Sequence, residues 1–344
     1  MKKLLSVIDI PERSSFYEPD KGLYLLKDYA LDGFELVYCG KDMSTFPRKN
    51  IVGLHLPFFA DWVNFWLKDY EFLDHDFGSR SAWINFFAAS KREDMIDFYQ
   101  SALDKALETE VEYMVFHVSQ VSLDETFTYK ARHSDATVIK CAIELINAIL
   151  GPFKEKLKTR AMPAPAFLME NLWWAGFNLL DPALTQTLID GIDYPNKGFM
   201  LDTGHLLCAR PSLATEEEGA DWIISCLKQH RQLLPFFRGI HLHSSLSKPY
   251  APVSRDLPSW EGLSYEERYA ESYYHVEKID KHEPWNLPRL KEILDLLPTE
   301  FLVYEFKYNS KEELCHKLRQ QVNFVEAALE EGEIHEKIGR TNIS

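Results

Sequence analysis

Residues 198–205 read GFMLDTGH, and this short stretch decides how the rest of the chain is interpreted. An apolar run of strand length ends in the carboxylate of Asp202, and the imidazole of His205 follows within one turn. A run that is apolar throughout, without alternation, is typical of a strand buried on both faces of a parallel sheet. Polar groups at the carboxyl end of such a strand lie where α/β folds bind their ligands.

Other segments share this pattern, and the chain contains eight predicted strands in all. They are residues 4–8, 34–38, 51–56, 113–118, 166–170, 198–202, 238–242 and 301–306. Helical periodicity extends over 92–110, 135–157 and 312–331, and Asp181 followed by Pro182 marks a further helix start. Strands that alternate with helices in this way predict an α/β fold, the (β/α)8 TIM barrel. An open doubly wound sheet is the alternative, but no strand is followed by a G-x-G-x-x-G turn.

Two connections are long for a barrel of this kind. Residues 57–91 follow the third strand and residues 243–285 follow the seventh, so both long loops lie on the side where barrels bind ligands. The sequence contains no internal repeat and no linker. Residues 1–344 are therefore predicted to form a single domain.

The composition limits the class of protein. A chain that is 46% hydrophobic can bury a large core, and its formal net charge of −15 weakly disfavours a nucleic-acid backbone as the main partner. The five cysteines are scattered without a C-x-x-C pair, which predicts reduced cysteines and a cytoplasmic location. The N-terminal apolar run is ended by Asp9, too early for a signal sequence, and no stretch reaches the roughly 18 apolar residues of a membrane span. We therefore expect no membrane partner.

Ionisable side chains stand at the ends of successive strands, from the third to the eighth. They are His55, His117, Glu170, Asp202, the pair His241 and His243, and Glu305. A single such residue is usually a hydrogen-bonded core residue. Several of them facing one barrel mouth would repel or desolvate one another unless cations bound them. Imidazoles together with carboxylates are ligands of Zn²⁺, Mn²⁺, Fe²⁺ and Co²⁺, so the pattern predicts a divalent metal site.

The spacing of these residues supports this interpretation. His241 and His243 are two residues apart, so their side chains face the same side of the strand. Asp280 and His282 repeat this spacing in the long connection after the seventh strand. For that second pair, a solvated acidic turn is the alternative interpretation.

With these residues identified, the sequence resembles the xylose-isomerase-like TIM-barrel superfamily, which includes endonuclease IV and the ketose 3-epimerases. The runs at 201–205 and 239–242 are close to patterns of that superfamily, and the resemblance extends from about residue 50 to 310. The endonuclease IV branch implies three zinc ions, one on His55, His117 and Glu170, one on Glu170, Asp202, His241 and Glu305, and one on His205, Asp280 and His282. The epimerase branch implies one ion, held by Glu170, Asp202, Glu305 and one of His241 and His243, with His205 touching the substrate.

The chain also departs from the endonuclease pattern. Residues 241–280 form a longer stretch than in the endonucleases, residues 283–285 lack their glycine-rich turn, and residues 57–91 contain no basic cluster for gripping a duplex. The sequence therefore favours an isomerase or epimerase of a small sugar or sugar phosphate, with Glu170, Glu305 and His205 as catalytic residues. A metal-dependent phosphodiesterase is the alternative, and a non-catalytic metal-binding barrel is a third. DNA is a disfavoured partner, and the native metal (Zn or Mn), the number of ions from one to three and the oligomeric state stay open.

Aromatic residues near the predicted mouth could stack on a sugar ring or an unpaired base. They are Phe58, Phe59, Trp62, Trp66, Trp173, Trp174, Trp260 and Trp285, and packing within the long loops is the alternative for each of them. We predict Trp62, Trp173 and His243 as substrate-binding residues. Lys248 is predicted to bind an anionic substrate group, with Arg255 as a second candidate, although either cation could be an ordinary surface charge.

Overall fold

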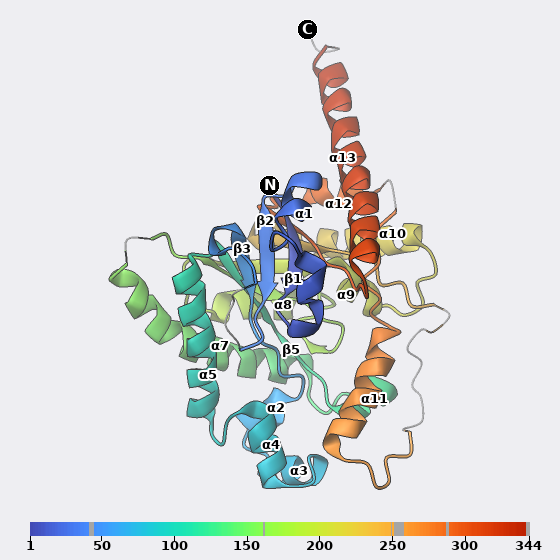
Figure 1. Ribbon diagram of the computed structural model, residues 1–344. Helices are drawn as coiled ribbons and strands as arrows, with labels where there is room; N and C mark the ends of the chain where they lie inside the picture. The colour runs from blue at the N-terminus through green and yellow to red at the C-terminus, as the bar shows by residue number, and fades with distance from the viewer. Residues whose placement is uncertain (41–44, 161, 249, 251–257, 287–288, 342–344) are drawn as a thin grey trace.

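The computed structural model describes residues 1–344 except 41–44, 161, 249, 251–257, 287–288 and 342–344, with side chains described as far as residue 330. Eight parallel strands close into a barrel in the order β1-β10-β9-β8-β6-β4-β3-β2 (Figure 1). They are β1 (Lys2–Ile8), β2 (Gly33–Val37), β3 (Ile51–His55), β4 (Tyr113–His117), β6 (Ala166–Glu170), β8 (Lys197–Asp202), β9 (Phe237–Leu242) and β10 (Phe301–Tyr304). The predicted (β/α)8 barrel is confirmed, and each strand overlaps the segment expected for it.

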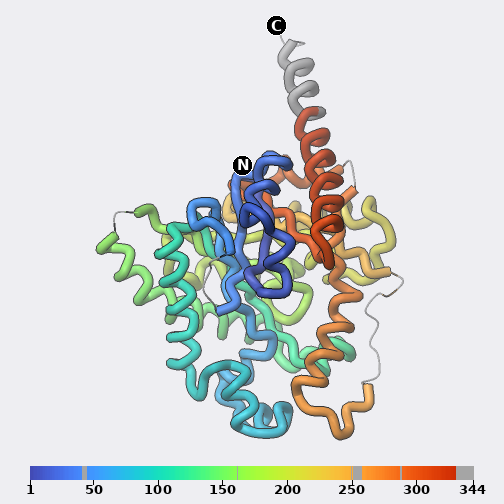
Figure 2. The backbone as a smooth tube through the Cα atoms, in the orientation of Figure 1, coloured from blue at the N-terminus to red at the C-terminus, as the bar shows by residue number. Residues whose placement is uncertain are grey.

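Helices with one apolar face surround the barrel (Figures 1 and 2). They are α1 (Leu23–Asp28), α5 (Arg92–Thr109), α7 (Asp135–Lys158), α8 (Pro182–Gly191), α10 (Glu216–Gln229), α12 (Leu290–Leu296) and α13 (Lys311–Thr341), with short 3-10 turns at η1 (Pro11–Tyr17), η2 (Arg48–Asn50) and η3 (Leu234–Phe236). The side chain of Asp181 caps α8 by accepting from the Ala183 N–H at 2.8 Å, as the Asp-Pro pair predicts. The described cysteines are free.

Helix α7 is long and apolar enough to cross a membrane by length and composition, with a mean hydropathy of 1.5. Half of its apolar window is buried inside the protein, and it packs against α5 and α8. Its buried stripe includes Val138, Ala142, Leu145, Ile149 and Phe153, the residues that the helical periodicity aligns. The helix is therefore accounted for as part of the barrel's outer layer.

The two long connections fold into helices of their own. After β3 the chain forms α2 (Trp62–Trp66), α3 (Tyr70–Asp76) and α4 (Arg80–Phe87), and after β9 it forms α11 (Tyr265–Glu277). Figure 1 shows α2, α3, α4 and α11 gathered beyond one end of the barrel. Tyr265 stacks on Phe77 with ring centroids 3.8 Å apart, which ties the two connections together, and α11 also contacts α6 (Leu123–Thr128). These segments form a covering over the carboxyl ends of the strands.

The register of the strands brings those carboxyl ends to one level. His117 pairs with Glu170 between β4 and β6, and Asp202 pairs with His241 between β8 and β9. A short antiparallel pair, β5 (Ser119–Gln120) with β7 (Ala175–Gly176), extends the wall of the mouth above them. The barrel thus places ionisable side chains from neighbouring strands side by side.

Apolar side chains fill the barrel interior below this level, among them Leu4, Val115, Leu168, Met200 and Val303. Tyr113 lies among them and donates its hydroxyl to Glu35 at 2.8 Å. Gly53 on the adjacent strand makes room for this ring, because a Cβ at position 53 would lie 2.2 Å from it. The mouth therefore rests on a packed floor that contains one buried carboxylate.

Candidate metal centre

Three groups of potential metal ligands lie at the carboxyl ends of the strands, and within each group the ligand atoms are within 4.8 Å of one another. The first contains His55, His117 and Glu170, the second contains Glu170, Asp202, His241 and Glu305, and the third contains His205, His243, Asp280 and His282. Glu170 belongs to two groups. The structure therefore brings together every residue proposed as a ligand from the sequence, with His243 as an addition to the third group.

In the first group, two imidazoles converge on one carboxylate oxygen. The Nε2 atoms of His55 and His117 lie 3.1 and 3.0 Å from Glu170 Oε2, and 3.2 Å from each other. The opposite nitrogen of His55, Nδ1, donates to the Leu56 carbonyl at 3.0 Å. Because this bond occupies the Nδ1 proton, the Nε2 lone pair of neutral His55 is directed at the centre of the group.

In the second group, His241 lies between carboxylates on both sides of its ring. Its Nδ1 is 3.2 Å from Glu170 Oε1 and 3.1 Å from Glu305 Oε2, and its Nε2 is 3.1 Å from Glu35. Glu35 is fully buried and also accepts the Tyr113 hydroxyl. A carboxylate behind a ligating imidazole orients the ring and fixes its tautomer, so Glu35 supports a metal site without joining it. We did not predict this role, although a glutamate inside the apolar run 34–38 was a visible signal.

Asp202 serves two purposes at the end of β8. Its Oδ1 caps α9 (Thr203–Cys208) by accepting from the His205 N–H at 2.6 Å. Its Oδ2 lies 3.0 Å from His243 Nε2 and 3.3 Å from His205 Nδ1. The cap therefore holds the second oxygen of the carboxylate toward the ligand groups.

In the third group, His282 Nε2 lies 2.7 Å from Asp280 Oδ2, and His205 Nε2 lies 3.7 Å from the same oxygen. Asp280 is held from behind by the Ser245 hydroxyl, which donates to Oδ1 at 2.7 Å. His282 has a φ of 50°, a left-handed conformation that is uncommon for a residue other than glycine. Strained backbone of this kind persists where the surrounding structure enforces it, often at functional sites.

The position of the His243 ring depends on Gly204 in α9. Its ring stacks on His282 with centroids 3.9 Å apart, and it is fully buried. A Cβ at position 204 would lie 2.0 Å from His243 Cε1, so the ring occupies space that only Gly204 leaves open. His243 therefore connects Asp202 of the second group to the third group.

Several buried polar atoms in these groups make no hydrogen bond to any described residue. They are Glu170 Oε1, Glu305 Oε2, His241 Nδ1 and His117 Nδ1. Buried polar atoms are nearly always hydrogen-bonded, and an unsatisfied charged one is costly. Unsatisfied carboxylate oxygens beside imidazole nitrogens fit divalent cations well, so the residues in this part of the chain are suited to hold metal ions.

The pKa values of the ligands reflect close pairing of opposite charges. Burial raises the pKa of Glu170, but His117 and His241 outweigh burial and hold that pKa well below its usual value. Burial lowers the pKa of His241 and of His205, but the carboxylates around them, Asp202 among those near His205, raise both well above the usual value. Without cations, protons on the imidazoles therefore provide the positive charge that the carboxylates require.

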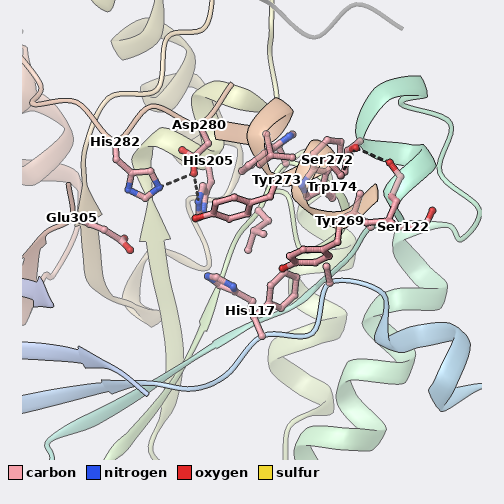
Figure 3. A pocket seen from close by; sticks show the side chains of 18 residues that line it. His117, Ser122, Trp174, His205, Tyr269, Ser272, Tyr273, Asp280, His282 and Glu305 are labelled. Carbon is pink, nitrogen blue, oxygen red and sulfur yellow. Dashed lines mark hydrogen bonds and ion pairs between the residues drawn. The ribbon is translucent and has the colours of Figure 1, made fainter. Parts of the chain in front are cut away.

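A cavity of about 270 Å³ opens directly onto the ligand groups (Figure 3). Its lining includes the ligands His117, His205, Asp280, His282 and Glu305. The rest of the wall is mainly aromatic and aliphatic, and among the residues described around this cavity no Lys or Arg contributes to the lining. A molecule in the cavity would contact any bound ions directly.

The other residues proposed for substrate binding occupy different environments. Trp173 lines the cavity, as do Phe58 and Trp174. Trp62 is buried and donates its indole N–H to the Ser119 carbonyl at 2.8 Å, and it is not among the lining residues. Lys248 is exposed, and Arg255 lies outside the described residues. Phe59, Trp66 and Trp285 pack in or against the hydrophobic core, and Trp260 borders a separate cavity.

These features define a (β/α)8 barrel with a cluster of candidate metal ligands at the carboxyl ends of its strands. The structure is similar to one named AsfvAP:AG, with 10% identity, a TM-score of 0.54, and coverage of 95% of this chain and 99% of that chain. It also resembles a D-tagatose 3-epimerase-like protein (13% identity, TM-score 0.49, 98% and 100% covered) and endonuclease IV from Thermus thermophilus (15% identity, TM-score 0.43, 95% and 100% covered). No family model and no curated protein matches the chain. The solved neighbours thus include the xylose-isomerase-like barrels that the sequence resembles, and they establish the fold alone.

Proposed function

We propose that this protein is a divalent-metal-dependent hydrolase that cleaves a phosphate ester of a small molecule. The observation that supports this reaction is the convergence of all three ligand groups around a shared Glu170. A single-ion isomerase requires only the second group. His55, His117, Asp280 and His282 would then have no chemical reason to converge on the same mouth.

The charge of the loaded site supports a phosphate substrate. The ligand set contains four carboxylates, Glu170, Asp202, Asp280 and Glu305, with a formal charge of −4. Three divalent ions would bring +6, which leaves about +2 for the site if the imidazoles are neutral, as ligation requires. An anionic ester would find its positive charge in the ions, because the lining described for the cavity offers neither Lys nor Arg.

The side chains of this protein have separate parts in the proposed hydrolysis. Divalent ions in these groups would supply an activated water and neutralise charge on the leaving oxygen. Glu170 would contribute a carboxylate oxygen to each of the first two groups, and Glu35 would keep the His241 ring oriented. In the reaction, a P–O bond to water oxygen forms, the P–O bond to the alcohol breaks, and the alcohol oxygen gains a proton.

Isomerisation or epimerisation of a sugar is the second candidate, and one observation favours it. Glu170 and Glu305 both approach His241 Nδ1, so two carboxylates flank the place where one ion would hold a substrate. Two such carboxylates could remove and return a carbon-bound proton on opposite faces of a sugar. This reaction uses the second group and leaves the other two without a role.

Direct assay of both reactions separates the candidates. Zinc- or manganese-loaded protein should release phosphate from phenyl phosphate or p-nitrophenol from bis(p-nitrophenyl) phosphate, and Glu305→Gln should reduce this hydrolysis by at least 100-fold. Glu155→Gln, an exposed residue of α7, is the matched control and should retain full activity. Epimerisation of ketohexoses without any phosphate release would overturn the proposal in favour of the second candidate.

A further inference from the structure

The cavity beside the ligand groups has walls built from aromatic rings of separate segments. Phe58 follows β3, Trp173 and Trp174 follow β6, and Tyr269 and Tyr273 come from α11. Phe58 lies 4.8 Å from the His117 ring and Trp173 lies 5.3 Å from the His205 ring, measured between centroids. Figure 3 shows that Tyr269 and Tyr273 lie around the same cavity as His117 and His205. A ring held by these walls would lie directly beside the metal ligands.

The size of the cavity limits what it can hold. Its volume is about 270 Å³, less than twice the roughly 150 Å³ of a cavity that holds benzene. One ring with its substituents fits this space. Tyr269 and Tyr273 are 39% and 54% exposed although they line the cavity, so the cavity reaches solvent beside them.

The polarity of the wall distinguishes a flat apolar ring from a sugar. Away from the ligand groups, the hydroxyl groups in the lining come from Ser122, Thr126 and Ser272, apart from the two tyrosines. The Thr126 hydroxyl donates to the Leu123 carbonyl at 2.7 Å and lies 2.8 Å from the Ser272 hydroxyl, so these two groups satisfy each other. A sugar would bury several hydroxyl groups against this wall with few partners, which costs free energy.

One residue of the wall has an unsatisfied polar atom. The indole N–H of Trp173 is buried and makes no hydrogen bond to any residue that the structure describes. Buried indole N–H groups usually find an acceptor. An acceptor on a substituent that extends past the edge of the indole would satisfy it.

We infer that the substrate is an aryl or heteroaryl phosphate ester, whose flat ring is stacked between Phe58, Trp173 and the tyrosines of α11 while its phosphate meets the metal ions. This inference rests on the proposed hydrolysis of a phosphate ester, and it adds the chemical class of the alcohol. The aromatic wall selects the ring, and the ions bind the charge. Aromatic stacking is tolerant of ring type, so the cavity accepts a family of such esters.

Binding of two phosphonates of equal charge tests the inference without any turnover. Zinc-loaded protein should bind phenylphosphonate at least tenfold more tightly than methylphosphonate in calorimetric titrations, because only the first places a ring between the aromatic walls. Trp173→Ala should remove this difference and leave methylphosphonate affinity and zinc content unchanged. Trp173→Phe keeps a ring and should retain most of the preference. Trp222→Phe on α10 is the matched control and should bind like the wild-type protein.

The outcomes separate the inference from the proposed function. Equal affinity for the two phosphonates, with both abolished by chelation, overturns the aryl inference while the hydrolase proposal stands. If neither phosphonate binds fully zinc-loaded protein, the aryl inference and the hydrolase proposal are both contradicted. A phenyl preference that persists in Trp173→Ala and in Phe58→Ala also overturns the inference, since the ring would then bind elsewhere.

Discussion

The carboxylate of Glu35 lies 3.1 Å from Nε2 of His241, and both side chains are fully buried. Glu35 comes from the second strand and is held on its other side by the Tyr113 hydroxyl. His241 therefore presents Nδ1 to Glu170 and Glu305, with its ring fixed from behind. This contact connects the barrel floor to the candidate metal ligands above it.

Replacing Glu35 should weaken metal binding although Glu35 is not a ligand. We expect Glu35→Gln to lower zinc affinity by roughly 10- to 100-fold, the usual effect of losing the carboxylate behind a ligating histidine. Competition with a chromophoric chelator measures this affinity, and Glu155→Gln serves as the surface control. Wild-type affinity in folded Glu35→Gln would refute the role given to this residue.

Zinc binding should release protons, and its affinity should fall as the pH falls. Burial lowers the pKa of His205 and His241, but neighbouring carboxylates raise both well above the usual value, which favours the protonated rings in metal-free protein. A metal binds the neutral ring, so about one proton per ring must leave. Calorimetry in buffers of different ionisation enthalpy counts these protons. His205→Gln should lower the count by about one, and heats that are independent of buffer would contradict the prediction.

Gly204→Ala should disturb the third ligand group through His243. A Cβ at position 204 would lie 2.0 Å from the His243 ring, and overpacking of this kind costs about 1–3 kcal/mol. Stability to urea and zinc content should both decrease. Gly151→Ala in α7 is the matched control, since no atom outside its immediate chain neighbours and the local helix backbone lies within 4 Å of its added Cβ. That variant should change stability by less than about 1 kcal/mol, because better helix propensity opposes crowding by the following Pro152.

Much of the fold could be predicted from the sequence because strands buried on both faces are continuous apolar runs. Each run became one barrel strand, and the register followed from closure of the sheet. The helices α2, α3, α4 and α11 were expected only as long loops, since many of their apolar residues pack on segments that are distant in the sequence. Such packing between distant segments, as between Tyr265 and Phe77, has no periodic signal in the sequence.

The candidate ligands were predictable because each ends a strand, repeats the two-residue spacing or, in the case of His205, follows a strand end within one turn. The contacts that position these residues could not be predicted from the sequence. Glu35 acts from inside a strand, and the place of His243 depends on the absence of a side chain at Gly204. Tyr269 and Tyr273 reach the cavity only because α11 folds back over it.

Duplex DNA should be a poor ligand. The net charge of −15 repels a polyanion, and the cavity of about 270 Å³ is too small for a duplex. At physiological salt we expect no tight binding to an abasic-site duplex by fluorescence anisotropy and no incision of it. Efficient incision that is lost with chelator and in Glu305→Gln would show that the polyanion is the substrate.

The number of metal ions per chain tests the central claim most directly. Elemental analysis of protein purified without chelator and saturated with zinc should give about three ions per chain, because the ligands form three groups. His55→Ala should lower this number to about two, whereas His316→Ala, an exposed residue of α13, should leave it at about three. Anomalous scattering would then place one ion in each group. A count near one that is unchanged in His55→Ala would contradict the three-ion centre and the hydrolase built on it.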